Sequence, residues 1–339
     1  MIGGELAATF LSRGWRVLAV VRDRNNGISP GERLQQRLMK SNRHWSRNRG
    51  SLIVLAGDVT KHNLGMPERY PGELSAIVHC AGETSFKNDD LCWETNCIGA
   101  ERIVAFAARM AVPPTILFVS TAFVCLSPPH SVVSEDTCYG GYDNGYTRSK
   151  RQAEQVFLRS GLRVVIVRPS IVLSAGIQDR RMARSVLWAV PLLMRMAEIP
   201  IDGAARLDIV PVDYVAQAVE RLLAKRSLSH TCYNVSSGQR GSVTCAEIAE
   251  DTFRRGYCEK RPTFLSSDKS RSYPRPHRLP TSSLDYYLPF LRADVVYSND
   301  RLVKELGSSH PNCARATEYI HELLAQIEVT EALRESECP

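Results

Sequence analysis

Short apolar runs alternate with amphipathic stretches along most of the chain. The runs show no regular polar alternation, which is typical of parallel strands in a sheet buried on both faces. Strands are predicted at residues 17–21, 52–55, 76–80, 115–119, 163–167, 208–212 and 232–235. Helices are predicted at residues 3–13, 33–39, 93–110, 147–159 and 213–223. This order predicts an α/β fold with a doubly wound parallel sheet.

The pattern changes in the second half of the chain. A basic, apolar, helix-like stretch at residues 180–196 interrupts the alternation, and Thr244 and Glu247 have the spacing of a capping box. That box predicts a helix to residue 255. We also expect a Pro-rich loop at residues 261–289 and a final helix at residues 316–333. We therefore expect a sheet domain and a smaller C-terminal lobe. The domain comprises residues 1–174 and 207–240, and the lobe comprises residues 175–206 and 241–339.

Composition indicates whether the chain can form a core, cross a membrane or bind a metal through its cysteines. The chain has 339 residues, of which 44% are hydrophobic and 23% charged, so it can bury a sizeable core. The best candidate for a membrane span, residues 186–194, is far shorter than the roughly 20 residues required and contains Pro191. The ten cysteines lack the CxxC spacing of metal sites. We therefore expect a cytoplasmic protein with free thiols, no metal and no membrane span.

The net charge of +7 is partly concentrated in one basic stretch, residues 22–49. An anion is expected to bind near it. Nucleic acid is not the expected partner, because the lone aromatic residue there, Trp45, provides no platform on which bases would stack.

The sharpest chemical pattern is the pair Tyr146 and Lys150. Their four-residue spacing at the start of a predicted helix places the phenol and the ammonium on one face. Because a neighbouring cation favours phenolate, we expect Lys150 to lower the pKa of Tyr146 towards the range of acid–base catalysis. Taken alone, this spacing is also that of an ordinary solvated face. Its position, after Ser120 and Thr121 and a glycine-rich loop at residues 140–145, favours a catalytic role.

Further motifs follow in a characteristic order. The chain resembles the extended short-chain dehydrogenase/reductases, and within them the thioester-reductase and fatty-acyl-reductase (male-sterility) branch. The matching segments are VHCAG at 78–82, TSF at 84–86, NCIG at 96–99, FVSTAFV at 118–124, SE at 134–135, YTRSK at 146–150, AE at 153–154, RPS at 168–170 and VPVDYVA at 210–216. The resemblance implies a Rossmann-like fold whose sheet domain binds NADP and whose lobe binds substrate.

The resemblance also implies roles for individual residues. Tyr146 donates the proton to a carbonyl that is being reduced, Thr121 hydrogen-bonds the developing oxyanion, and Lys150 binds the nicotinamide ribose. Ser120 is the alternative to Thr121 if the register shifts by one residue, and Asn96 completes the catalytic candidates. The implied cofactor contacts are Gly3, Arg22, Asp58, Val59, Cys80, Ala81, Gly82, Lys150, Arg168, Pro169 and Ser170.

The cofactor is expected to be NADPH rather than NADH. Arg22 follows the strand at residues 17–21, where an arginine accommodates a 2′-phosphate and an acidic residue binds a 2′-hydroxyl. Asp23 comes next, but the basic stretch around it favours NADPH. Asp58 is expected to contact the adenine, with a turn cap as its alternative role.

The start of the chain departs from the family pattern. The family begins with a strand and a TGxxGxxG turn, whereas here Gly3 matches the last glycine alone. The first strand and most of the turn that receives the pyrophosphate are therefore expected to be missing. Two explanations stay open: the true start lies upstream, or the chain is a degraded copy that binds cofactor poorly.

Three functions are compatible with these motifs. The first is NADPH-dependent reduction of an acyl thioester, on a carrier protein or coenzyme A, to an aldehyde or alcohol. The second applies the same machinery to a ketone, a secondary alcohol or a sugar nucleotide, including epimerisation. The third is a non-enzymatic, degenerate relative. Family members often dimerise through the helices expected here at residues 93–110 and 147–159, so a homodimer is a further expectation.

Overall fold

A four-stranded parallel sheet forms the centre of the molecule, with its strands in the order β10-β6-β4-β3. These strands are β3 (Ala76–His79), β4 (Thr115–Val119), β6 (Val164–Pro169) and β10 (Cys232–Val235). The computed structural model describes residues 2–24, 27–41, 50–66, 73–86, 88–125, 130–137, 144–173, 193, 196, 198–258, 260–265 and 288–324. Because the strands are parallel, their carboxyl ends meet at one edge, where the loops that follow them lie close together.

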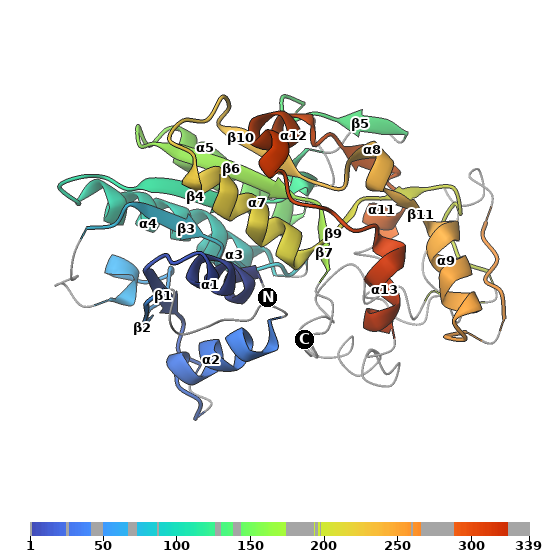
Figure 1. Ribbon diagram of the computed structural model, residues 1–339, viewed down its shortest axis with the longest axis horizontal. Coiled ribbons are helices and arrows are strands. Elements are labelled where there is room, and N and C mark those ends of the chain that lie inside the picture. Colours follow the sequence, from blue (N-terminus) through green and yellow to red (C-terminus); the bar gives the residue numbers. More distant parts are fainter. Residues whose placement is uncertain are drawn as a thin grey trace.

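Helices cover both faces of this sheet (Figure 1). On one face, α1 (Ile2–Ser12) and α7 (Val212–Ala224) pack against each other and against buried side chains of β4, β6 and β10. On the other face, α4 (Gly99–Ala108) and α5 (Gly145–Leu158) cover Ile116 and Phe118, which are fully buried. The predicted α/β fold with a parallel sheet is confirmed.

A second parallel sheet contains β1 (Val17–Val21) and β2 (Leu52–Ala56). It packs against α1 and α2 (Pro30–Lys40), and α2 begins at a capping box formed by Ser29 and Glu32. Within the described residues, β1 pairs with β2 alone and β3 pairs with β4 alone. The first two predicted strands are therefore confirmed, but hydrogen bonds do not join them to the central sheet there.

Short paired strands connect the sheet to the C-terminal part of the chain. They are β5 (Ser131–Val133) with β12 (Val295–Tyr297), β7 (Ile171–Leu173) with β9 (Ile209–Pro211), and β8 (Arg206–Leu207) with β11 (Val243–Thr244). The lobe helices are α8 (Gly238–Gly241), α9 (Cys245–Arg254), α11 (Leu288–Leu291), α12 (Asp300–Leu306) and α13 (Ala316–Leu324). The predicted capping box of Thr244 and Glu247 is present at the start of α9.

Three predicted elements differ from the observed ones. The helix expected at residues 93–110 begins earlier and consists of α3 (Asp89–Cys92), a π-helix η2 (Trp93–Ile98) and α4. The strand expected to stop before Arg168 continues through Pro169, because Pro169 lies in register with Val235 of β10. The strand expected at residues 208–212 is shorter, since β9 begins after Asp208 and α7 begins at Val212, and β9 pairs with β7 rather than with the central sheet.

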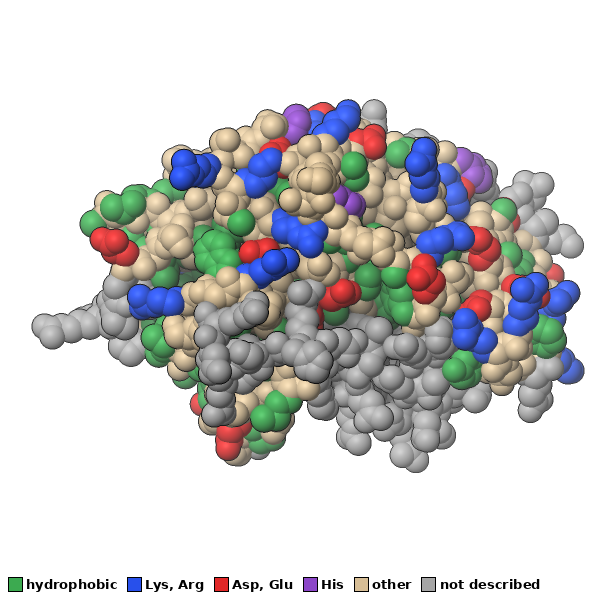
Figure 2. Space-filling view, in the orientation of Figure 1, with side chains coloured by type: hydrophobic (Ala, Val, Ile, Leu, Met, Phe, Trp, Pro, Cys, Tyr) green, Lys and Arg blue, Asp and Glu red, His purple; other side chains and the backbone are tan. Residues whose placement is uncertain are grey.

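Other predictions fall partly beyond the described residues. The helix-like stretch at 180–196, the glycine-rich loop at 140–145 and the loop at 261–289 lie mostly outside them, and the last helix is described only to Leu324. In the portions of the chain that are described, no helix has the length and apolar character needed to cross a bilayer. The same portions contain no cluster of His, Cys, Asp or Glu side chains suited to a metal ion. On the face shown in Figure 2, Lys and Arg side chains are spread among acidic ones.

Candidate active site

The first turn of α5, which carries Tyr146, is fixed by two side chains. Asn144 is the N-cap, and its side-chain oxygen accepts a hydrogen bond of 2.9 Å from the Thr147 amide. Asp89, from α3, accepts a 3.1 Å hydrogen bond from the Gly145 amide and forms an ion pair with Arg148. These contacts satisfy amide groups that a helix otherwise leaves unpaired.

Thr121 and Tyr146 meet at the carboxyl edge of the sheet. Thr121 follows β4 and caps the short 3₁₀-helix η3 (Ala122–Val124), and its side chain is hydrogen-bonded to that of Tyr146. Burial raises the pKa of Tyr146 to about 12, although the hydrogen bond from Thr121 opposes this change. The expectation that this pKa is lowered is wrong, because desolvation of the phenol, together with the nearby Cys92, raises it more than the hydrogen bond lowers it.

Lys150 lies one helical turn further along α5 and is 4% exposed. Its Nζ donates a 3.1 Å hydrogen bond to the Val119 carbonyl and lies 4.8 Å from the centre of the Phe118 ring. Burial lowers the pKa of Lys150 to about 8, against the opposing influence of Cys80 and Glu154. The ammonium is therefore still the main form at neutral pH.

Asn96 connects α5 to the loop after β3. It lies in the π-helix η2, and its Nδ2 donates to the Glu83 carbonyl and to Ser149 Oγ, both at 2.9 Å. Its Oδ1 accepts from the Glu83 amide at 2.9 Å. A Cβ on Gly82 would stand 2.8 Å from Asn96 Oδ1 and 3.1 Å from Lys150 Nζ. Only glycine permits this approach of the backbone to the two polar groups.

The edge beside these residues fits a dinucleotide. Ala81 and Gly82 are exposed immediately after β3. The first turn of α1 lies against the same strand end, since a Cβ on Gly3 would be 3.2 Å from the Cys80 sulfur. A helix N-terminus favours phosphate. Ser120 is buried, and its Oγ has no hydrogen-bond partner among the described residues.

The proposed adenosine end of the site lies beyond β1 and β2. Arg22 is exposed directly after β1, and its carbonyl accepts a hydrogen bond from Arg33 on α2. Asp58 follows β2, and its Oδ1 accepts from the amide and the hydroxyl of Thr60, both at 2.9 Å. This oxygen therefore caps a turn, the alternative role considered above. Val59 lies against Gly99 at the start of α4.

The RPS segment is occupied by contacts within the protein. Arg168 is buried and forms an ion pair with Glu154 of α5. Pro169 ends β6, and the Ser170 amide donates a 3.2 Å hydrogen bond to the Val235 carbonyl. A cofactor contact for these three residues stays a prediction.

The family model described as male sterility protein matches residues 1–219, more than half of the chain. The chain belongs to this family. It is a member of the extended short-chain dehydrogenase/reductases, as the sequence motifs indicated.

Individual proteins that resemble this male sterility family member are consistent with the family assignment. It is similar to fatty acyl-CoA reductase 8 of Arabidopsis thaliana, with 24% identity over an alignment of 271 residues, which covers 60% of this chain and 54% of the relative. The chain thus spans about half the length of the curated plant relatives it matches.

Two solved structures share the fold. The terminal R domain of the myxalamid PKS-NRPS pathway has a TM-score of 0.73 at 22% identity, covering 96% of this chain and 87% of that one. An archaeal thiolation-reductase di-domain has a TM-score of 0.76 at 16% identity, covering 98% and 74%.

The structure of this family member also contains an aromatic cluster that the sequence did not predict. The Phe86 ring lies 5.7 Å from that of Tyr146 and stacks on Phe290 at 4.9 Å. Phe123, two residues after Thr121, meets Phe290 edge-on at 4.9 Å. Phe86 and Phe123 belong to the TSF and FVSTAFV motifs. Phe290, however, is 144 positions after Tyr146 in the chain, and no motif or pattern around it indicated that it lies near Tyr146. The cluster places an apolar wall beside the Tyr146 phenol.

Proposed function

We propose that the chain is an NADPH-dependent reductase that converts an acyl thioester, on a carrier protein or coenzyme A, to an aldehyde or alcohol. The observation that carries the proposal is the convergence of Thr121, Tyr146 and Lys150 beside Gly82 at the carboxyl edge of the sheet. The relatives named as fatty acyl-CoA reductase and as reductase domains support the substrate class.

The side chains suit the reduction of a carbonyl. A bound nicotinamide supplies the hydride to the carbonyl carbon. Tyr146, which burial keeps protonated near neutral pH, donates its proton to the carbonyl oxygen, and Thr121 hydrogen-bonds the same oxygen as negative charge develops. Lys150 binds the ribose hydroxyls with its ammonium. When the substrate is a thioester, loss of the thiol from the reduced carbon then gives the aldehyde.

Two arginines support the preference for NADPH. The exposed Arg22 side chain stands at the end of β1, and Arg33 is hydrogen-bonded to its carbonyl. Arg33 Nη1 is buried without a hydrogen-bond partner among the described residues. Two guanidinium groups at one strand end provide the charge that a 2′-phosphate needs.

The test combines cofactor binding with turnover. Fluorescence titration should show tighter binding of NADPH than of NADH, and the purified chain should then form aldehyde from acyl-coenzyme A or an acylated carrier protein. Tyr146→Phe should lower kcat by about 100-fold or more while NADPH affinity changes less than about twofold, because only proton donation is lost. Turnover of ketones with no aldehyde from any thioester would contradict the substrate class. Unchanged turnover in Tyr146→Phe would contradict the mechanism.

A further inference from the structure

Arg168 is a buried charge near the candidate site, and its partners lie on several segments of the chain. Its side chain is 7% exposed and that of Glu154 is 2% exposed. The guanidinium binds both carboxylate oxygens of Glu154, through Nε at 2.9 Å and Nη2 at 2.6 Å. Its Nη1 donates to the Glu135 carbonyl at 3.0 Å and to Cys125 Sγ at 3.2 Å. All three nitrogens of this guanidinium therefore have partners.

The partners of Arg168 belong to the segments that carry the catalytic candidates. Glu154 is four residues after Lys150 and so lies on the same side of α5. Cys125 is the C-cap of η3, the short helix whose N-cap is Thr121. One guanidinium thus bonds to the helix that carries Tyr146 and to the turn that carries Thr121.

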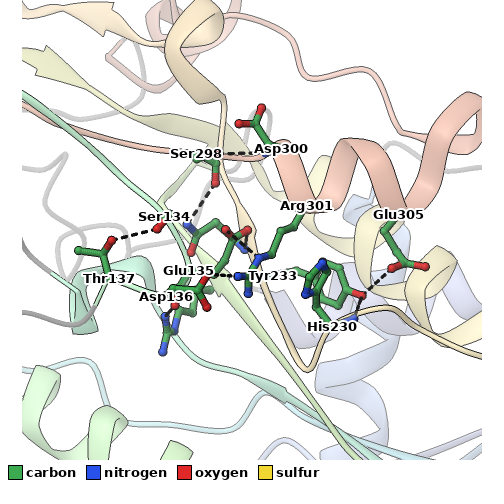
Figure 3. Close-up of polar contacts among 12 residues, drawn as sticks. Ser134, Glu135, Asp136, Thr137, His230, Tyr233, Ser298, Asp300, Arg301 and Glu305 are labelled. Carbon is green, nitrogen blue, oxygen red and sulfur yellow. Dashed lines mark hydrogen bonds and ion pairs between the residues drawn. The ribbon is translucent and has the colours of Figure 1, made fainter.

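The third partner, Glu135, is itself held in place. Its Oε1 accepts a 3.0 Å hydrogen bond from the Asn234 amide of β10, and its Oε2 lies 3.6 Å from Arg301 Nε. Figure 3 shows Arg301 extending from α12 towards Glu135 and Asp136. The carbonyl that Arg168 binds is therefore fixed to the central sheet and to the C-terminal part of the chain.

We propose that Arg168 is a positioning residue, which holds α5 and the η3 turn at the separation that brings the Thr121 hydroxyl to the Tyr146 phenol. The planar guanidinium binds three segments at once through a rigid fork, whereas a lysine ammonium cannot reproduce this geometry. The inference rests on the proposed reductase function. It differs from the cofactor contact that the motif implied for Arg168, and the two roles affect different measured constants.

The test compares Arg168→Lys with Arg163→Lys. Arg163 immediately precedes the same strand, is exposed at the opposite end, and donates a hydrogen bond to the Arg226 carbonyl. Arg168→Lys keeps the charge beside Glu154 and should lower kcat roughly 10- to 100-fold through misplacement of the reacting groups, with NADPH Kd and substrate KM within about twofold. Arg163→Lys should leave kcat, Kd and KM unchanged.

A second pair of variants tests the link to the η3 turn without changing any charge. Cys125→Ala removes one contact of Arg168 and should lower kcat by a smaller factor, about two- to fivefold, again at constant Kd. Cys245→Ala removes another buried thiol, at the start of α9, and should have no effect on kcat. This pair decides the proposal if Arg168→Lys does not fold.

Three kinetic results would overturn the proposal. The first is a higher NADPH Kd with kcat retained in Arg168→Lys, which would assign Arg168 to the cofactor. The second is unchanged kinetics in Arg168→Lys, and the third is an equal kcat loss in Cys125→Ala and Cys245→Ala.

Amide hydrogen exchange separates this proposal from the reductase function, because it needs no substrate. If the wild type reduces no thioester, faster exchange at residues 122–125 in Arg168→Lys, and not in Arg163→Lys, still supports the positioning role, and unchanged exchange contradicts it.

Discussion

Burial governs the ionisation of both members of the Tyr146 and Lys150 pair. The spacing of the two residues predicted a shared helical face, and the structure places both on α5. The spacing could not show how much solvent each group loses, and desolvation moves the two pKa values apart, to about 12 for Tyr146 and about 8 for Lys150. Both shifts favour the neutral form of the side chain. The pair therefore suits donation of a proton from tyrosine better than storage of a phenolate.

The pKa of Lys150 predicts a pH dependence of cofactor binding. Below about pH 8 the side chain carries its charge, and as pH rises through that value the proton is lost. NADPH Kd should therefore rise above pH 8, by at most roughly tenfold per pH unit, because one proton is linked to binding. Fluorescence titrations between pH 6.5 and about 9.5 measure this, with Lys150→Met as a weak-binding, pH-independent control. The same flat profile in the wild type would show that Lys150 does not hold the cofactor.

At the scale of elements, helix α5, which carries Tyr146, depends on contacts from outside its own segment. The Asn144 cap is local and precedes the helix directly, so its role follows from a known capping preference. Asp89 is 56 residues before Gly145, and no local pattern reveals their hydrogen bond. Tyr146 lies in the turn that both residues stabilise.

Removing the cap should therefore affect both stability and catalysis. Asn144→Ala should lower the free energy of unfolding by about 1 kcal/mol, and it should lower kcat because the turn that holds Tyr146 frays. Thr244→Ala removes the equivalent cap of α9 in the lobe, with a similar stability loss of about 1 kcal/mol and little change in kcat. Urea unfolding and turnover of both variants measure the two effects. Equal kcat values in the two variants would contradict a special role for the first turn of α5.

Local patterns predicted the long elements and missed features that depend on tertiary contacts. The strands β1, β3 and β4 were found within a residue of their ends, because continuous apolar runs identify them. The π-helix that contains Asn96 was read as ordinary helix, since an extra residue in one turn leaves the apolar pattern nearly unchanged. Short strands such as β12, only three residues long, carry too little pattern to be recognised, and β12 pairs with a segment far away in the sequence.

At the scale of the whole molecule, one buried carboxylate connects three parts of the chain. Asp208 is 3% exposed and lies between β8 and β9. Its Oδ1 accepts from the amide and the hydroxyl of Ser237, at 2.9 and 2.8 Å, just after β10 of the central sheet. Its Oδ2 accepts from the Tyr297 amide of β12 at 3.1 Å. Burial raises the pKa of Asp208, yet these donors compensate part of the cost of its charge.

This arrangement predicts that Asp208→Asn weakens the attachment of the C-terminal segment to the sheet. An asparagine has one oxygen, so its amide nitrogen must face either the Ser237 donors or the Tyr297 amide, and a buried donor then lacks an acceptor. The expected loss is about 1–3 kcal/mol in the free energy of unfolding.

Asp251→Asn is the matched control, because Asp251 pairs with Arg255 on the surface of α9 and such pairs contribute at most about 1 kcal/mol. Urea unfolding measures both losses, and limited proteolysis should cut Asp208→Asn first near β12, since that strand loses a backbone hydrogen bond. Equal stability losses in the two variants would show that Asp208 contributes no more than a surface ion pair.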